Sequence, residues 1–455
     1  MTHRSWIPVV VLAILGWYTN TGYSFPYAES GKYLGPAAVV AAKDGATLFV
    51  LCIDANQVAV VEAASGKVAR TIALPSAPTG LALSPDGAHL YVTFGQAQGT
   101  VGVVEVASGK VAATIPVGHT PVAPVVSPDG KRLYVCNRFH NNVSVVDLAA
   151  KKEIAKAPAT REPIAAAITP DGKTLLVANL LSTDRGDSYD VAALVTLIDT
   201  ATNQPASIRL PNGSTGLHGI AVSPDGKHAY VSHILARYQM PTTQLERGWM
   251  NTNALSILDV AAKKLVNTVL LDDVDLGAAN PWGVATTADG KQICVTHAGT
   301  HEVSVIDAPG VMDKLSKIPV EAKPADPSKP YDNRGSYSSA TQADVPNDLA
   351  FLVDLRRRIR LQNSPLFGPQ TTGPLVNGPR GLAVVGSKAY VALYFSDNLA
   401  VVDLSPKPEK QVTIVPLGPE PKLTVQRRGY MHFNDADLCF QHWQSCASCH
   451  PDARV

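Results

Sequence analysis

The amino-acid sequence predicts an all-β fold, a seven-bladed β-propeller with four-stranded blades, followed by a short α-helical segment at the C-terminus. The first observation behind this prediction is a repeating unit of about forty residues, a length typical of a propeller blade. The unit is clearest at residues 78–118, where four short apolar runs are separated by turn residues. In its first turn, Pro presets the second position and Gly permits a positive φ, so the flanking runs form a hairpin. Each unit therefore predicts a four-stranded antiparallel meander.

The second observation is that this turn recurs along the chain. The Ser-Pro-Asp-Gly turn at 84–87 has counterparts, some degenerate, at 42–45, 127–130, 169–172, 223–226, 287–290 and 385–388. Successive copies are separated by 42, 43, 42, 54, 64 and 97 residues. Because only the later intervals are long, we expect insertions in the loops of the later blades, where added length costs little entropy. Seven such blades close into a ring with short, protected edges.

Three parts follow from this pattern. Residues 1–24 form a signal peptide, residues 25–418 form the propeller, and residues 419–455 form a separate C-terminal segment. The stretch at 1–24 differs in composition from the rest, because Arg4 precedes an apolar run and small polar residues follow it. We therefore expect export to the periplasm or beyond in a bacterium. An uncleaved N-terminal anchor is the alternative, and only then would a membrane be a partner.

Insertions are expected within blades four and five, at 182–192 and 234–253, and within blade six, at 308–354. In the blade-six insertion we predict helices at 311–318 and 345–355.

Three consecutive arginines, Arg356, Arg357 and Arg358, lie in the predicted fourth strand of blade six. They suggest a phosphate site, but alternating arginines on a solvated strand face are the favoured interpretation. Charge over the whole chain is balanced, with 39 basic against 38 acidic residues. This balance gives no electrostatic case for nucleic acid or an anionic membrane surface.

The C-terminal segment contains the pentad Cys446-Ala447-Ser448-Cys449-His450. A C-x-x-C-H pattern is typical of covalent c-type haem attachment, in which two thiols bind the haem and the adjacent His ligates the iron. A redox-active C-x-x-C pair or half of a zinc site are the alternatives. The βαβ context of the former is absent from the sequence, and for the latter only Cys439, His432 and His442 could offer the second ligand pair. The sequence therefore predicts haem c on Cys446, Cys449 and His450, with His450 as an iron ligand.

Residues 426–435 together with this pentad resemble the first haem segment of the dihaem cytochrome c peroxidase/MauG family. The resemblance departs at His432, where that family usually has Leu. The propeller resembles the YVTN family of bacterial surface and periplasmic propellers, through Tyr91-Val92-Thr93 and Tyr134-Val135-Cys136-Asn137. Together these resemblances imply an exported haem protein with an electron-transfer or peroxidase-like oxidoreductase role, and an electron donor or acceptor protein as partner. Because a cytochrome fold needs more residues than follow His450, we expect the haem domain to continue beyond Val455.

The alternative function is a propeller that is not an enzyme, binds a protein or a metal, and has a vestigial haem segment. The sequence gives one candidate for such a metal site. The inner strand of each blade is expected to start, and its second strand to end, at the same face of the ring, which we call the mouth face. Three histidines from neighbouring blades should then lie together at this face, with Trp282 and Arg380 beside them; they are His218, His233 and His297. Imidazoles from adjacent blades could hold copper or zinc. Polar residues that bond nearby backbone are the favoured interpretation.

The fourth strand of the last blade must also end at the mouth face. The sequence therefore predicts that the haem segment lies over the mouth beside blades five to seven, on the side opposite the Ser-Pro-Asp-Gly turns. It places the blade-six insertion on that opposite side.

Overall fold

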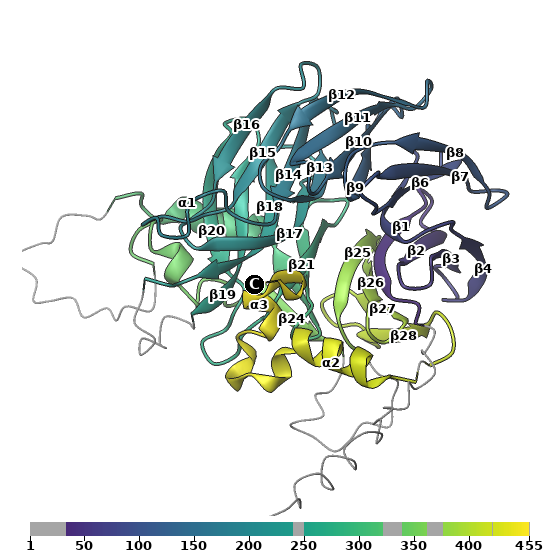
Figure 1. The fold of residues 1–455 in the computed structure, drawn as a ribbon. Helices are drawn as coiled ribbons and strands as arrows, with labels where there is room; N and C mark the ends of the chain where they lie inside the picture. The colour runs from purple at the N-terminus through teal and green to yellow at the C-terminus, as the bar shows by residue number, and fades with distance from the viewer. Residues whose placement is uncertain (1–32, 240–249, 322–338, 362–375, 421, 455) are drawn as a thin grey trace, which may run out of the picture.

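A computed structural model describes residues 33–239, 250–321, 339–361, 376–420 and 422–454. In this part of the chain, seven four-stranded antiparallel sheets surround a central axis (Figure 1). The prediction of a seven-bladed all-β propeller is confirmed. The predicted signal peptide at 1–24 lies outside the described residues.

Each blade is formed by four strands that are consecutive in the sequence. The first strands of neighbouring blades contact one another around the ring and so lie innermost. Blades one to three comprise β1 (Pro36–Ala41), β2 (Thr47–Cys52), β3 (Gln57–Glu62), β4 (Val68–Ala73), β5 (Pro78–Leu83), β6 (His89–Phe94), β7 (Thr100–Glu105), β8 (Val111–Pro116), β9 (Pro121–Val126), β10 (Arg132–Asn137), β11 (Asn142–Asp147) and β12 (Lys152–Pro158).

Blades four to seven follow the same order. They comprise β13 (Pro163–Ile168), β14 (Thr174–Asn179), β15 (Leu194–Asp199), β16 (Pro205–Arg209), β17 (Ser214–Val222), β18 (His228–Ala236), β19 (Asn251–Asp259), β20 (Lys264–Leu270), β21 (Pro281–Thr286), β22 (Gln292–His297), β23 (Glu302–Asp307), β24 (Arg356–Arg360), β25 (Pro379–Val385), β26 (Lys388–Leu393), β27 (Asn398–Asp403) and β28 (Val412–Pro416).

Burial explains the hydrophobic pattern of the strands. The second and third strands of a blade, such as β6 and β7, are covered on both faces by neighbouring blades and are almost continuously buried. They are accordingly rich in Val, Leu and Tyr, as buried strands of any sheet are. The fourth strands β4 and β8 alternate between exposed residues and residues that are partly or fully buried, because only one face packs on the ring.

The recurring turn has its own chemistry. Ser84 Oγ donates to Asp86 Oδ1 at 2.5 Å, and the same carboxylate oxygen accepts from Ala88 N at 3.0 Å. Gly87 adopts a φ of 74°, which a residue with a Cβ rarely tolerates. The side-chain bond from Ser or Thr to Asp recurs at the turns of four further blades. The turn thus closes the first hairpin of each of these blades with local bonds alone.

The blade-six insertion differs in part from its prediction. Helix α1 (Ala308–Lys317) forms close to where a helix is predicted, and Asp307 caps it by accepting from Gly310 N at 3.1 Å. The second predicted helix, at 345–355, is wrong: only the short η2 (Val345–Asn347) forms there. The insertion also does not stay on the face opposite the mouth. It packs along the outer strand of blade five, because β20 and the adjacent core offer apolar surface.

The C-terminal segment is helical, as predicted, and consists of short pieces. They are α2 (Val425–Asn434), η3 (Ala436–Leu438), η4 (Phe440–His442), α3 (Cys446–Cys449) and η5 (Pro451–Ala453). Thr424 caps α2 by accepting from Arg427 N at 3.2 Å. In Figure 1 this yellow segment leaves β28 and passes below β24 towards β19 and β21. Among the described residues no helix is long and apolar enough to cross a membrane.

Candidate functional site

The mouth face is the end of the ring at which the second strand of each blade finishes. Of the histidines predicted to end second strands, His297 ends β22, while β18 continues three residues past His233 to Ala236. The other second strands end at Cys52, Phe94, Asn137, Asn179 and Leu393. Four sets of contacts hold the C-terminal segment across this face, and together they join it to six of the seven blades.

The first contact fastens α2 to blades seven and one. Arg427 is 7 % exposed, forms an ion pair with Asp54 at 2.9 Å and donates to the carbonyl oxygen of Tyr394 at 2.8 Å. Its guanidinium also lies 4.5 Å from the ring centre of Tyr394 and 4.7 Å from that of Tyr33. The charge of this buried guanidinium is paired with a carboxylate, and its flat faces lie against aromatic rings. These contacts offset the cost of removing the charge from water, and they exist only when α2 is docked, so Arg427 holds the helix strongly in place.

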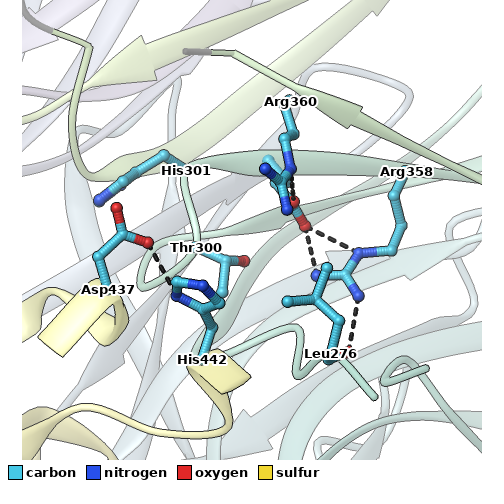
Figure 2. Close-up of a pocket in the computed structure, with 8 residues that line it drawn as sticks. Leu276, Thr300, His301, Arg358, Arg360, Asp437 and His442 are labelled. Atoms are coloured by element: carbon cyan, nitrogen blue, oxygen red, sulfur yellow. Dashed lines mark hydrogen bonds and ion pairs between the residues drawn. The ribbon is translucent and has the colours of Figure 1, made fainter. Parts of the chain in front are cut away.

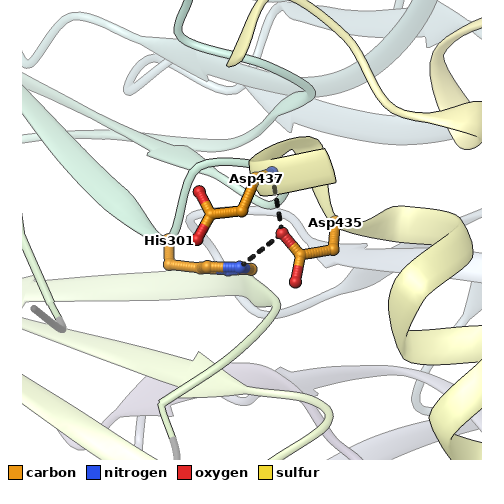
Figure 3. Close-up of side chains that lie close together, drawn as sticks. All are labelled: His301, Asp435 and Asp437. Atoms are coloured by element: carbon orange, nitrogen blue, oxygen red, sulfur yellow. Dashed lines mark hydrogen bonds and ion pairs between the residues drawn. The ribbon is translucent and has the colours of Figure 1, made fainter. Parts of the chain in front are cut away.

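The second contact lies over blade six (Figure 3). His301 Nε2 lies 3.2 Å from Asp435 Oδ1, and Asp437 N donates to the same oxygen at 2.9 Å. Asp437 in turn lies 2.9 Å from His442 Nδ1 (Figure 2). These pairs join a loop of blade six to η3 and η4 of the C-terminal segment.

His301, Asp435 and Asp437 also form a group of potential metal ligands, with donor atoms within 4.8 Å of one another. The backbone N–H of Gly378, however, donates to His301 Nδ1 at 3.2 Å. A ring nitrogen that accepts leaves the N–H of the imidazole on Nε2, which lies 3.2 Å both from Asp435 Oδ1 and from the side-chain amide of Asn377. Since a metal would need a lone pair on that same nitrogen, the group suits a hydrogen bond better than a metal ion.

The arginines of β24 lie beside this contact, and their burial differs from the solvated strand face predicted for them. Arg358 donates to Glu302 Oε2 at 2.6 Å (Figure 2). It also forms an ion pair with Asp273 at 2.8 Å. The side chains of Arg358 and Arg356 are only 10 % and 4 % exposed, so a solvated strand face is wrong for these two. They hold the loop before β21, to which the C-terminal segment bonds through Gly277 N and the carbonyl of Gln441 at 2.8 Å.

The third contact lies between blades five and six, where α3 rests. Asn280 Nδ2 donates to Ser445 Oγ at 2.7 Å, and Asn280 Oδ1 accepts from Ser448 Oγ at 2.5 Å. Ser445 and Ser448 also bond each other in a capping box, which sets the first turn of α3. Trp443, just before this turn, is 2 % exposed and packs on apolar residues of blade five. The turn that contains the two cysteines is therefore rigidly seated.

The fourth contact reaches blades three and four at the far side of the mouth. Glu162 accepts from Arg454 Nη2 at 2.7 Å and from Arg138 Nη2 at 2.9 Å, and Arg138 also pairs with Asp452. Burial alone would raise the pKa of Glu162, but the hydrogen bonds from the two arginines outweigh it and lower the pKa. A charge network of this kind fixes the residues directly after His450.

The pentad itself is displayed towards solvent. Cys446, Cys449 and His450 are all exposed, and the two cysteines lie on the single turn of α3. His450 Nδ1 lies 3.2 Å from the carbonyl oxygen of Arg454. An imidazole that donates one N–H to a carbonyl keeps its other nitrogen as a lone-pair donor, which is the usual state of an iron-ligating histidine. These residues fit a covalently bound haem.

Two of the three candidate metal ligands, His233 and His297, instead bond nearby groups, in line with the interpretation favoured from the sequence. His233 lies 2.7 Å from Ser256 Oγ and 3.1 Å from the carbonyl of Ile234 through its two nitrogens. His297 bonds Ser304 Oγ and the carbonyl of Ala278, both at 2.8 Å. Both rings point into their own blades and have no nitrogen left for a metal. The described residues do bring His218, Trp282 and Arg380 together, with the rings of the first two stacked at 3.8 Å.

Sequence reasoning missed the residues that seat the segment, chiefly Arg427, Glu162, Asn280 and Trp443. Most of them are single polar residues in loops, and nothing in their local sequence marks them. Glu162 adopts a φ of 60°, which is uncommon outside glycine, but this strain appears only in the structure. Trp443, a large apolar residue in a polar segment, is the one that gave a usable signal.

Comparisons with known proteins agree with the fold. No family model matches the chain. The chain is 28 % identical over 210 residues to hydrazine synthase subunit beta of Kuenenia stuttgartiensis. The match covers 46 % of this chain and 46 % of that protein, so the chain spans about half the length of the curated relative.

A solved structure of Kuenenia stuttgartiensis hydrazine synthase has the same fold, with a TM-score of 0.69 and 26 % identity. It covers 85 % of this chain and 100 % of the solved chain. This chain is therefore similar, in sequence and in propeller fold, to a subunit of hydrazine synthase.

Proposed function

We propose that this protein is an exported propeller subunit of an oxidoreductase assembly related to hydrazine synthase, and that it carries haem c on Cys446, Cys449 and His450. The observation that carries the proposal is the C-x-x-C-H turn, which is exposed yet rigidly seated across the propeller mouth. Similarity to a protein named as a subunit of hydrazine synthase supports the redox context and the presence of partner chains.

The propeller would serve as a platform that fixes the haem-binding turn. Contacts through Arg427, Asn280 and Glu162 distribute the docking over six of the seven blades. A redox group must be held at a constant distance and orientation from its partner, and a seat formed by folded strands meets that need better than a free loop.

The residues around the pentad would hold and tune the group. α3 presents Cys446 and Cys449 from one helical turn, and the Arg454 carbonyl holds the ring of His450 in one tautomer. When bound, a c-type haem supplies one-electron oxidation and reduction. Within such an assembly, the role of this protein would be electron transfer or a peroxidase-like oxidation, with an exported electron donor or acceptor protein as partner.

The proposal is tested by asking whether the chain binds haem covalently. The full chain, expressed in bacteria that mature c-type cytochromes, is expected to show a haem-stained band on a denaturing gel and a reduced haemochrome spectrum of the c type. The double variant Cys446→Ala/Cys449→Ala should lose both signals, because no thiol of the motif remains. Cys439→Ala is the matched control, since Cys439 lies in the same segment but outside the motif, and it should keep both.

A chain that stays colourless while a reference cytochrome in the same cells is loaded would contradict the proposal. Haem that survives in the double variant would equally contradict the assignment of the two cysteines. Either result would favour a propeller that binds partners without a redox group.

A further inference from the structure

One positive charge stands where the inner strands begin at the mouth face. In six blades the inner strand starts with a proline that pairs with the last residue of the second strand, as Pro379 does with Leu393. The residue after each proline therefore lies at the mouth face. These residues are Ala37, Thr79, Val122, Ile164, Trp282 and Arg380. Arg380 is the charged member of this set, and its neighbours in the set are neutral.

The Arg380 side chain is held in place by aromatic rings. Its backbone carbonyl accepts from Thr296 Oγ1 at 2.7 Å, which fixes the start of β25. Its guanidinium lies over the rings of Trp282 and Tyr394, 4.8 and 3.7 Å from the ring centres. Trp282 is itself stacked on His218 at 3.8 Å. Contact through the flat face of a guanidinium leaves the N–H groups at its edges free to donate.

Most of these N–H groups are unused. A guanidinium has five N–H groups, and within the described residues the Arg380 side chain donates one long hydrogen bond, from Nη2 to the Tyr430 hydroxyl at 3.5 Å. Arg380 is half-buried and Tyr430 is 37 % exposed, and the contact between them lies open to solvent. Both groups are therefore within reach of a dissolved molecule.

The charge of Arg380 is also not neutralised by an ion pair in the part of the chain that the structure describes. Two carboxylates at the mouth face are engaged by other arginines, since Asp54 pairs with Arg427 at 2.9 Å and Asp452 pairs with Arg138. A guanidinium that is partly removed from water attracts an anion more strongly than a fully exposed one, because water screens its charge less. The surroundings of Arg380 thus favour an anionic ligand.

We propose that Arg380 and Tyr430 form a binding site for a small, planar oxyanion of the carboxylate class. Two N–H groups along one edge of a guanidinium match the two oxygens of a carboxylate. The Tyr430 hydroxyl accepts from Arg380 and so keeps its own proton to donate to the same ligand. Arg380 belongs to blade seven and Tyr430 to α2, so the site is complete only when the C-terminal segment is docked. It needs no haem and is independent of the proposed function.

Formate is the probe for the test, because it is a planar carboxylate with only three non-hydrogen atoms. The full chain is labelled with fluorotryptophan and titrated with formate at constant, low ionic strength, and fluorine NMR follows the ring of Trp282, which lies against Arg380. Its resonance is assigned by its absence in Trp282→Phe. We expect a saturable shift with a Kd of about 1 mM, as befits so small a ligand.

Four comparisons identify the groups that bind. Arg380→Gln removes the charge and should weaken formate binding at least about tenfold, while Arg380→Lys keeps the charge but loses the two-point edge and should weaken it less. Tyr430→Phe keeps the ring and removes one donor, so it should weaken binding by roughly threefold or more. Arg428→Gln is the matched control, because it removes the same charge from an exposed position of α2, and it should leave the Kd unchanged. Formamide has the size of formate without its charge and should bind at least about tenfold more weakly.

A shift of the Trp282 resonance that does not saturate would overturn the proposed site. A formate affinity that Arg380→Gln or Tyr430→Phe leaves unchanged would do the same. Formamide binding as tightly as formate would overturn the proposed ligand class.

Discussion

At the scale of the residue, the histidines of the second strands act as neutral hydrogen-bonding groups. His233 and His297 are fully buried, and each accepts from a serine hydroxyl and donates to a backbone carbonyl. Burial lowers the pKa of His233 to about 4 and, together with the nearby Arg358 charge, that of His297 to about 3. Each ring therefore stabilises the fold only while it is uncharged.

A pH dependence of stability follows from these two histidines. A histidine with a pKa of 6.5 in the unfolded chain and about 4 in the fold binds more protons when unfolded between those values. Its stabilisation is complete above pH 6.5 and is lost as the pH falls towards 4. Each histidine should contribute a slope of about 1.4 kcal/mol per pH unit to the free energy of unfolding in this window.

Chemical denaturation at pH 6.5, 5.5 and 4.5 checks this expectation. The double variant His233→Gln/His297→Gln should be less stable at pH 6.5, yet show a slope flatter by about 2–3 kcal/mol per pH unit. His140→Gln, at an exposed histidine, is the control and should keep the wild-type slope. Equal slopes in the double variant and the wild type would show that the two rings do not titrate as we argue.

At the scale of the element, α2 is held by one side chain more than by its own helical stability. It has only ten residues, a length at which an isolated helix is marginal in water. Arg427 supplies an ion pair with Asp54, a hydrogen bond to Tyr394 and contacts with three aromatic rings. The docking of the whole segment onto blades seven and one therefore depends on this residue.

Arg427→Ala is expected to weaken that docking by about 2 kcal/mol, the usual loss for a hydrogen bond to a charged group. Limited proteolysis should then cleave the C-terminal segment roughly tenfold faster or more, while the propeller core stays resistant. Arg428→Ala is the matched control, because Arg428 is the next residue, carries the same charge and is exposed. Equal cleavage rates in the two variants would mean that Arg427 does not anchor the segment.

At the scale of the whole molecule, the first and last blades of the described part of the chain form separate sheets. Within it, blade one consists of β1 to β4 and blade seven of β25 to β28. Closure depends on packing between these blades and on Asp397, which accepts from Leu34 N and Gly35 N, both at 2.9 Å. Tyr33 adds a bond from its hydroxyl to the Lys422 carbonyl at 3.1 Å.

Removing the Asp397 carboxylate should loosen the interface between blades one and seven before the other interfaces of the ring. Asp397→Ala loses two charge-assisted hydrogen bonds and is expected to destabilise the chain by about 3 kcal/mol. Hydrogen exchange should accelerate in β1 and β25 before it does in blades three and four. Asp403→Ala removes an aspartate at the other end of β27, where the carboxylate accepts from the nearby Ser405 N, a local bond, and should cost much less. Uniform exchange across all blades would contradict a seam between blades one and seven.

Much of this architecture could be predicted from the sequence. The turn of Ser or Thr with Asp and Gly is closed by bonds within five residues, so its presence in the sequence implies its structure. Strand order follows from the same repeats, and strand direction then places the ends of the second strands and of β28 at one face. The docking of the C-terminal segment over the mouth was predictable for that reason, and it is confirmed.

Other features were decided only by tertiary structure. His233 and His297 reach the predicted end of the ring, but their rings turn into the blades because Ser256 and Ser304 offer hydroxyls there. Arg356 and Arg358 alternate as on a solvated strand, yet a loop carrying Asp273 covers them.

The difference has a physical cause. A repeat and its turns are local, because their bonds join residues that are close in the chain, and the sequence alone determines them. The orientation of a histidine, the cover over an arginine and the stacking of Arg380 on two aromatic rings depend on groups that are distant in the chain. Their positions are set by the closing of the ring and by the C-terminal segment that lies across it.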